Sequence, residues 1–80
     1  MTSSSISEKP VGVIGAGNFG TVIANILAFN RKVLLYARDK RVVSHILEKR
    51  ENRGYPIHSN VEPTHDLAFL ASQCDVIFSH

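Results

Sequence analysis

The stretch that decides the fold is VGVIGAGNFG, residues 11–20. Its first four residues are apolar and mostly β-branched, as expected of a buried strand in a parallel sheet. The next six follow the pattern G-x-G-x-x-G, and an amphipathic segment comes directly after them. A strand, a glycine-rich turn and a helix in this order form the phosphate-binding start of a dinucleotide-binding unit. The segment therefore predicts a parallel α/β sheet with an anion-binding turn.

Each glycine of this pattern has a separate expected role. Gly15 permits the tight turn, Gly17 lets the backbone approach a pyrophosphate, and Gly20 lets the helix pack close to the strand. The free N–H groups at the helix start and the helix dipole then face the phosphate charge. A glycine-rich turn without a ligand is the alternative, which the strand before it and the helix after it disfavour.

Apolar runs and helical periodicity alternate outward from this segment. We expect strands over about 10–14, 32–37, 60–62 and 75–78, and helices over about 18–29, over 40–50 and from residue 66. Pro63 would place the third strand at an edge or keep it short. In the first helix, large apolar residues at helical spacing form one apolar face, and the small Ala24 and Ala28 fit close packing. The large residues are Phe19, Val22, Ile23, Ile26 and Leu27.

This alternation predicts the fold class. It is α/β, a Rossmann-type open parallel sheet with helices on both faces, truncated after the fourth strand. Residues 10–80 form the N-terminal part of an NAD(P)-binding domain, and residues 1–9 are a flexible leader.

The end of the second strand bears on which nicotinamide cofactor the turn would hold. NAD-binding sheets usually place an acidic residue there, which bonds the ribose 2′-hydroxyl. Here Ala37 lies near that position and Arg38 follows it, and an arginine suits a 2′-phosphate. Asp39 is expected to cap the next helix, although it would favour NAD if it faced the ribose. The residues thus favour NADP and leave NAD open.

The motif GAGNFGT at residues 15–21 resembles the opening signature of NAD(P)-dependent glycerol-3-phosphate dehydrogenases. Arg38-Asp39 and the segments 51–56 and 64–67 are similar to that family too, so the resemblance covers nearly all of residues 11–78. It implies the NAD(P)-binding portion of an enzyme that reduces dihydroxyacetone phosphate to sn-glycerol 3-phosphate for phospholipid precursor supply. The cofactor-binding residues expected from the turn and the resemblance are Gly15, Ala16, Gly17, Asn18, Phe19, Gly20, Arg38 and Asp39. For Phe19, packing in the core is an equal alternative.

The chain departs from the family pattern in several places. Tyr55-Pro56 shortens the family's Y-x-P element, and Ser79 lacks the Ala-Val-Pro that would precede it. The resemblance implies catalytic lysines after the fourth strand and in a separate helical domain, and no residue here matches them. We therefore expect no catalytic residue in this chain, which is interpreted as a truncated product or isolated domain that positions the cofactor.

Two other functions stay open. A nucleotide-sensing regulatory module would use the same strand, turn and helix, although such modules usually end the second strand with an acidic residue. Another two-domain NAD(P)-dependent dehydrogenase, acting on a sugar or hydroxy acid, would be distinguished by sequence beyond His80.

Composition disfavours other classes of protein. The net charge of +2 is spread along the chain, which argues against a nucleic-acid partner. No apolar run approaches the ~20 residues of a membrane span, and the start lacks a signal-peptide core, so the cytoplasm is the expected compartment. Cys74 is expected to be a small buried apolar residue, and the scattered histidines indicate neither a metal site nor catalysis. Expected partners are the small-molecule cofactor, the remainder of the dehydrogenase chain and a second copy in a homodimer.

Overall fold

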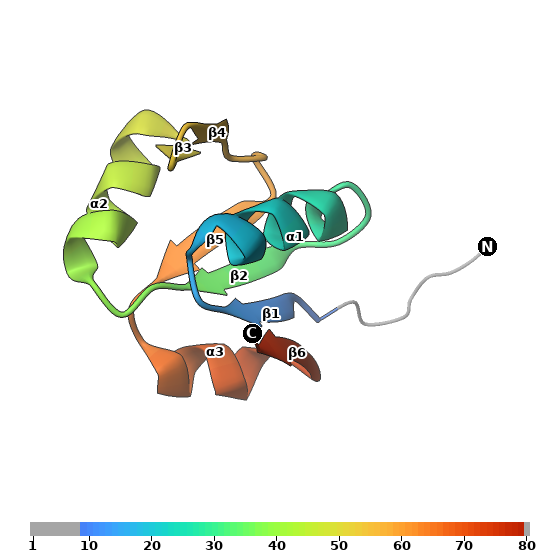
Figure 1. Ribbon diagram of the computed structural model, residues 1–80. Helices are drawn as coiled ribbons and strands as arrows, with labels where there is room; N and C mark the ends of the chain where they lie inside the picture. The colour runs from blue at the N-terminus through green and yellow to red at the C-terminus, as the bar shows by residue number, and fades with distance from the viewer. Residues whose placement is uncertain (1–8, 80) are drawn as a thin grey trace.

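The computed structural model describes residues 9–79, which form a four-stranded sheet with helices on both faces and a separate small hairpin (Figure 1). Along the chain the elements are β1 (Val11–Ile14), α1 (Asn18–Ala28), β2 (Val33–Tyr36), α2 (Lys40–Lys49), β3 (Glu51–Asn52), β4 (Tyr55–Pro56), β5 (Val61–Thr64), α3 (Leu67–Gln73) and β6 (Val76–Ser79). Apart from Lys9, the predicted leader lies outside the described residues.

The sheet has the strand order β5-β2-β1-β6, and every neighbouring pair is parallel. The chain moves from β1 to β2 and β5 on one side, then returns to β6 on the other side of β1. This reversal makes a topological switch point at the carboxyl end of β1, where such sheets bind ligands. Pro63 lies in β5, which is an edge strand of the described sheet, as predicted. The predicted Rossmann-type fold is confirmed.

Helices α1 and α2 cover one face of the sheet and α3 covers the other (Figure 1). The larger core lies beneath α1 and α2 and comprises Val13, Ala24, Ala28, Val33, Leu35, Ile46, Ile57 and Val61. A smaller core beneath α3 comprises Leu34, Leu70 and Cys74. Gly12 allows this second layer to approach, because a Cβ there would lie 2.7 Å from Cδ2 of Leu70. Cys74 is buried, as predicted, and burial raises the pKa of its thiol.

Helix α1 packs on the sheet through small residues, as predicted for Ala24 and Ala28, and its predicted large apolar face is only partly buried. Its buried residues are Gly20, Thr21, Ala24 and Ala28. Phe19 and Ile26 are 57% and 58% exposed, whereas Ile23 and Leu27 are only partly buried against the core. Small side chains bring the helix backbone close to the strands, and this close approach leaves the bulky residues on the flank.

The segment after α2, in which the sequence analysis predicts neither a helix nor a strand, forms a two-stranded hairpin. In it, β3 pairs antiparallel with β4. Arg53 and Gly54 at its tip both have positive φ, 54° and 87°, as a type I′ turn requires. Asn25 on α1 donates from Nδ2 to the carbonyl oxygen of Pro56 at 2.8 Å. The hairpin therefore lies against α1, above the sheet in the view of Figure 1.

Candidate functional site

The glycine-rich turn joins the carboxyl end of β1 to the start of α1. Gly15 adopts a φ of +109°, which residues with a side chain rarely occupy. Its N–H donates to the carbonyl oxygen of Tyr36 at 3.0 Å, which ties the turn to the end of β2. The turn therefore lies at the switch point of the sheet, where a ligand of this fold is expected.

Gly17 and Gly20 have opposite surroundings. A Cβ at Gly20 would lie 1.8 Å from the carbonyl oxygen of Gly15, so any side chain would strike the backbone. A Cβ at Gly17 would meet no atom within 4 Å. The space beside Gly17 belongs to a hollow of about 190 Å³ lined by Ile14, Gly15, Gly17, Asn18, Phe19 and Gly20. Gly20 thus serves packing, whereas Gly17 borders open space.

The start of α1 is electrostatically suited to an anion. Gly17 is the N-cap and offers no side-chain acceptor, and the first turn carries no acidic residue. The first N–H groups of a helix have no acceptor inside the helix, and the helix dipole adds positive potential there. Nothing on α1 itself neutralises this potential, so the hollow beside Gly17 can accept a phosphate.

Two residues that the sequence analysis did not assign to the site hold the turn from inside. Asn52 is 6% exposed, and its Nδ2 donates to the carbonyl oxygen of Ala16 at 3.0 Å and to Oγ1 of Thr21 at 2.9 Å. Oγ1 of Thr21 donates in turn to the carbonyl oxygen of Gly17 at 2.6 Å. The hydrophobic pattern contains no signal that this amide is buried, because its partners lie more than 30 residues away in sequence.

Asn18 and Phe19 begin α1 at the rim of the hollow. Both are exposed, so the alternative that Phe19 packs in the core is wrong. The Phe19 ring also borders an apolar groove of about 330 Å³ between α1 and β6. The other residues lining this groove are Val13, Ile14, Gly20, Ile23, Ile26, Leu27, Phe78 and Ser79.

The segment after β2 lies at the same edge of the sheet as the turn. Ala37 is buried, and its N–H donates to the carbonyl oxygen of Thr64 at 2.9 Å. Arg38 is exposed, and within residues 9–79 its guanidinium has no ion-pair partner. At this edge, the Arg38 guanidinium is therefore free to bind a ligand, and the position of Ala37 carries no carboxylate.

Asp39 caps α2, as predicted. Its Oδ1 accepts from the backbone N–H of Arg41 at 2.8 Å, and its Oδ2 pairs with the Arg41 guanidinium at 2.9 Å. The side-chain hydrogen bond from Arg41, followed by the backbone one, lowers the pKa of Asp39 from its usual 3.8. Both carboxylate oxygens are thus engaged within α2.

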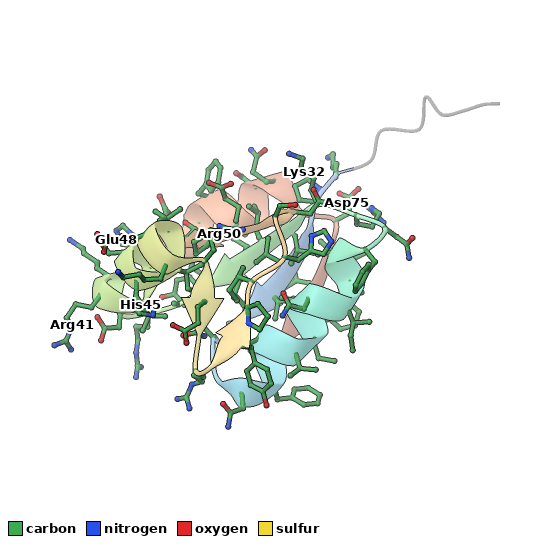
Figure 2. The ribbon with its side chains drawn as sticks, turned by 90° about the horizontal axis from the view of Figure 1, so that it is seen from above. Lys32, Arg41, His45, Glu48, Arg50 and Asp75 are labelled. Atoms are coloured by element: carbon green, nitrogen blue, oxygen red, sulfur yellow. The ribbon has the colours of Figure 1, made fainter. Side chains whose placement is uncertain are left out.

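Five of the side chains labelled in Figure 2 fall into two groups, whereas the sixth, Arg50, donates to the carbonyl oxygens of His58 and Val61 at 2.8 and 2.9 Å. Arg41, His45 and Glu48 extend from α2, which begins at the edge where β2 ends. Lys32 and Asp75 precede β2 and β6 and lie at the amino ends of the strands. A cation at the opposite end of the sheet from the glycine-rich turn is therefore available as an experimental control.

Two of the three described histidines, His45 and His58, make side-chain contacts within the fold. His45 Nε2 lies 2.7 Å from Oε1 of Glu51, and the ring of His58 packs edge-on against Phe29 with centroids 5.1 Å apart. Between residues 9 and 79 no group of three or more His, Cys, Asp or Glu side chains could hold a metal ion. No helix in that part of the chain is long and apolar enough to cross a membrane.

Comparison with known proteins gives consistent matches. A family model described as NAD-dependent glycerol-3-phosphate dehydrogenase N-terminus matches residues 10–80. The chain is 40% identical over 76 residues to a glycerol-3-phosphate dehydrogenase (NAD(P)+) of Pseudomonas paraeruginosa, covering 89% of this chain and 22% of that protein. It is 38% identical over 78 residues to a protein of the same name from Azotobacter vinelandii, covering 91% and 23%. The chain thus spans about a fifth of the length of these curated relatives.

Proposed function

The chain belongs to the family of NAD-dependent glycerol-3-phosphate dehydrogenase N-termini, and we propose that it is the cofactor-binding part of an enzyme that reduces dihydroxyacetone phosphate to sn-glycerol 3-phosphate. In this proposal residues 10–80 hold NAD(P)H, and the catalytic groups come from outside them. The names of the relatives, which specify NAD(P)+, support a nicotinamide dinucleotide as the ligand.

The open hollow beside Gly17 is the observation that carries this proposal. A side chain at Gly17 would fill space that no other atom occupies within 4 Å. The start of α1 beside it carries neither a capping side chain nor an acidic residue that would compete with an anion. A pyrophosphate, with its two negative phosphates, suits this combination of space and positive potential.

The residues of the turn and of the β2–α2 segment fit a dinucleotide. We assign the pyrophosphate to the backbone of Gly15, Ala16, Gly17 and Asn18. Phe19 would flank it, while Gly20 keeps α1 against the strand. When bound, NAD(P)H supplies the hydride, and these residues supply its position.

We assign the adenosine ribose to Arg38, and this assignment favours NADP. The guanidinium of Arg38 is exposed and unpaired within residues 9–79, and an arginine suits a 2′-phosphate. Ala37 offers no carboxylate that would repel the phosphate. Asp39 lies beside Arg38, but both of its carboxylate oxygens are engaged by Arg41. We propose that Asp39 contributes to cofactor binding indirectly, by fixing the start of α2.

The wider role rests on the family alone. We propose that the enzyme works in the cytoplasm as a homodimer and supplies sn-glycerol 3-phosphate as a precursor of phospholipids. Recognition of dihydroxyacetone phosphate and the proton transfer belong, in this proposal, to the remainder of the dehydrogenase.

Calorimetric titration of the purified chain with NADPH and with NADH tests the proposal, with circular dichroism of the same sample as a check on folding. We expect saturable binding of both, tighter for NADPH. Tighter binding of NADH would overturn the assignment of Arg38 but keep the cofactor site. A folded chain that binds neither dinucleotide would contradict the proposed function.

A further inference from the structure

We propose that Asn52 and Thr21 are positioning residues that aim the amide groups of the glycine-rich turn at the bound pyrophosphate. This inference rests on the proposed function, and it gives the β3–β4 hairpin a part in cofactor binding. Neither residue touches the hollow through its own polar atoms, because those atoms are bonded to the inner side of the turn.

The contacts form a short chain of donors that ends on two carbonyl groups of the turn. The Nδ2 group of Asn52 has two hydrogens, and it donates at 3.0 Å to the Ala16 carbonyl oxygen and at 2.9 Å to Thr21 Oγ1. The Thr21 hydroxyl then donates its one hydrogen at 2.6 Å to the Gly17 carbonyl oxygen, which also accepts the backbone N–H of Thr21 at 3.0 Å. Thr21 is 0% exposed and Asn52 6%, so solvent does not compete for these bonds.

Because the peptide bond is planar, these contacts determine the direction in which the N–H groups of the turn point. In a trans peptide the C=O and the N–H of the next residue point in opposite directions within one plane. Holding the Ala16 carbonyl inward therefore turns the N–H of Gly17 outward, and holding the Gly17 carbonyl inward does the same for Asn18. Both N–H groups belong to residues that line the hollow. The turn is thus fixed before a ligand arrives, which reduces the ordering cost of binding.

The hairpin that carries Asn52 is itself held in place by contacts with two helices, α1 and α2. Glu51 accepts from the Gly54 N–H at 2.7 Å and contacts His45 of α2 at 2.7 Å. Asn25 of α1 donates to the Pro56 carbonyl oxygen at 2.8 Å. These bonds keep the Asn52 side chain against α1 rather than in solvent.

The choice of amide at position 52 also follows from its partners. A charged aspartate cannot donate, so it would face the Ala16 carbonyl oxygen without a hydrogen bond. It would also bring negative charge close to the proposed pyrophosphate. Asparagine is uncharged at every pH and donates twice from one nitrogen.

A matched set of variants separates positioning from general stability. Asn52→Ala removes the double donor, and Thr21→Val removes the hydroxyl while keeping the shape of the side chain. Thr21→Ser restores the hydroxyl. Asn60→Ala is the control, because Asn60 Nδ2 donates at 2.9 Å to the Ala28 carbonyl oxygen at the far end of the same helix. It removes the same kind of bond to α1 without touching the turn.

Two measurements on the purified chain test the proposal. Calorimetric titration with NADPH should show dissociation constants about tenfold higher for Asn52→Ala and Thr21→Val, and within about twofold of wild type for Thr21→Ser and Asn60→Ala. In the absence of ligand, ¹H–¹⁵N spectra should show shifted amide signals for Gly17 and Asn18 in the first two variants only.

The two measurements distinguish failure of the proposed function from failure of the positioning role. If wild type binds no dinucleotide, the proposed function fails. The amide signals of Gly17 and Asn18 then still test whether Asn52 and Thr21 position the turn. Unchanged Gly17 and Asn18 signals in a folded Thr21→Val variant would overturn the inference. An Asn60→Ala variant that weakens NADPH binding as much as Asn52→Ala would overturn it as well, because the effect would then be one of stability.

Discussion

A side chain at Gly17 would enter the hollow, whereas a side chain at Gly20 would strike the chain itself. The φ of Gly17 is −81°, which any residue can adopt, and no atom lies within 4 Å of its missing Cβ. We expect Gly17→Val to change the free energy of unfolding by less than about 1 kcal/mol, as at other unconstrained positions. The same variant should abolish NADPH and NADH binding, because its side chain occupies the proposed phosphate site. Urea unfolding and calorimetry measure the two effects.

Gly20→Ala is the control for this prediction. Its Cβ would lie 1.8 Å from the Gly15 carbonyl oxygen, so α1 must move away from the strand. Overpacking of this kind lowers the free energy of unfolding by roughly 1–3 kcal/mol, and sometimes more. Retained NADPH affinity in Gly17→Val, or equal stability of the two variants, would show that the two glycines do not have the roles assigned to them.

Arg38 is the residue whose removal should change cofactor preference. A hydrogen-bonded charged group contributes about 1.5–3 kcal/mol, or roughly ten- to hundredfold in affinity. We expect Arg38→Ala to raise the dissociation constant for NADPH by this factor and to leave that for NADH within about twofold. Lys32→Ala, which removes a cation at the amino ends of the strands, should affect neither (Figure 2). A parallel loss of affinity for both dinucleotides in Arg38→Ala would contradict recognition of the 2′-phosphate.

The residues of the site differ in how well the sequence predicts their surroundings. Gly15 and Gly20 follow from the spacing in the turn, because a tight strand-to-helix connection has only a few solutions. The capping role of Asp39 follows from its place before a helical segment. Asn52 could not be found this way, because its burial depends on a hairpin folding back over the turn.

At the scale of elements, a similar limit explains why the sequence does not show that part of the apolar face of α1 stays exposed. Periodicity identifies where apolar side chains cluster, but not how closely a helix approaches the sheet. Gly20 and Ala24 permit an approach at which larger side chains no longer fit beneath the helix. The hairpin was missed for a related reason. Its strands have two residues each, too few for an alternating pattern, and only Gly54 after Arg53 marks the turn.

The hairpin should lose part of its stability in acid through Glu51. The hydrogen bond from His45, and then that from the Gly54 N–H, lower the pKa of Glu51 from its usual 4.5. The folded chain therefore binds fewer protons at this group than the unfolded chain. Its stabilising contribution is complete above about pH 4.5 and is lost as the pH falls through the lowered pKa.

Glu51→Gln removes this charge at every pH. We expect the urea midpoint of wild type to exceed that of the variant near neutral pH, and the difference to shrink as the pH falls below 4.5. Glu48→Gln is the matched control, because Glu48 is exposed on α2 and has no ion-pair partner within residues 9–79. A difference between wild type and Glu51→Gln that stays constant from neutral pH into acid would exclude a role for the Glu51 charge.

For the whole molecule, the alternation of strands and helices was enough to predict the parallel sheet and its layers. Short apolar runs bounded by turns became strands, and the crossovers placed helices on both faces. The unequal size of the two cores was not predictable. It depends on α3 burying only Leu70 beside Cys74 on one face, while α1 and α2 together cover the other face. A chain of 80 residues with this arrangement has a free energy of unfolding of about 4–12 kcal/mol by general scaling.

Cofactor binding should therefore change the stability of the whole molecule by a measurable fraction. The proposed site consists of the β1–α1 turn, held by the hairpin, and the segment after β2, which only the folded chain brings together. A ligand that binds only the folded state at one hundred times its dissociation constant adds about 2.7 kcal/mol. We expect the thermal midpoint to rise with the logarithm of NADPH concentration, by several degrees for each tenfold increase, because about 1 kcal/mol shifts a domain of this size by roughly 4–8 °C. Gly17→Val should show no rise over the same range. If the midpoint of wild type stayed constant while calorimetry showed binding, NADPH would have to bind the unfolded chain equally well, and the site could not be one that folding assembles.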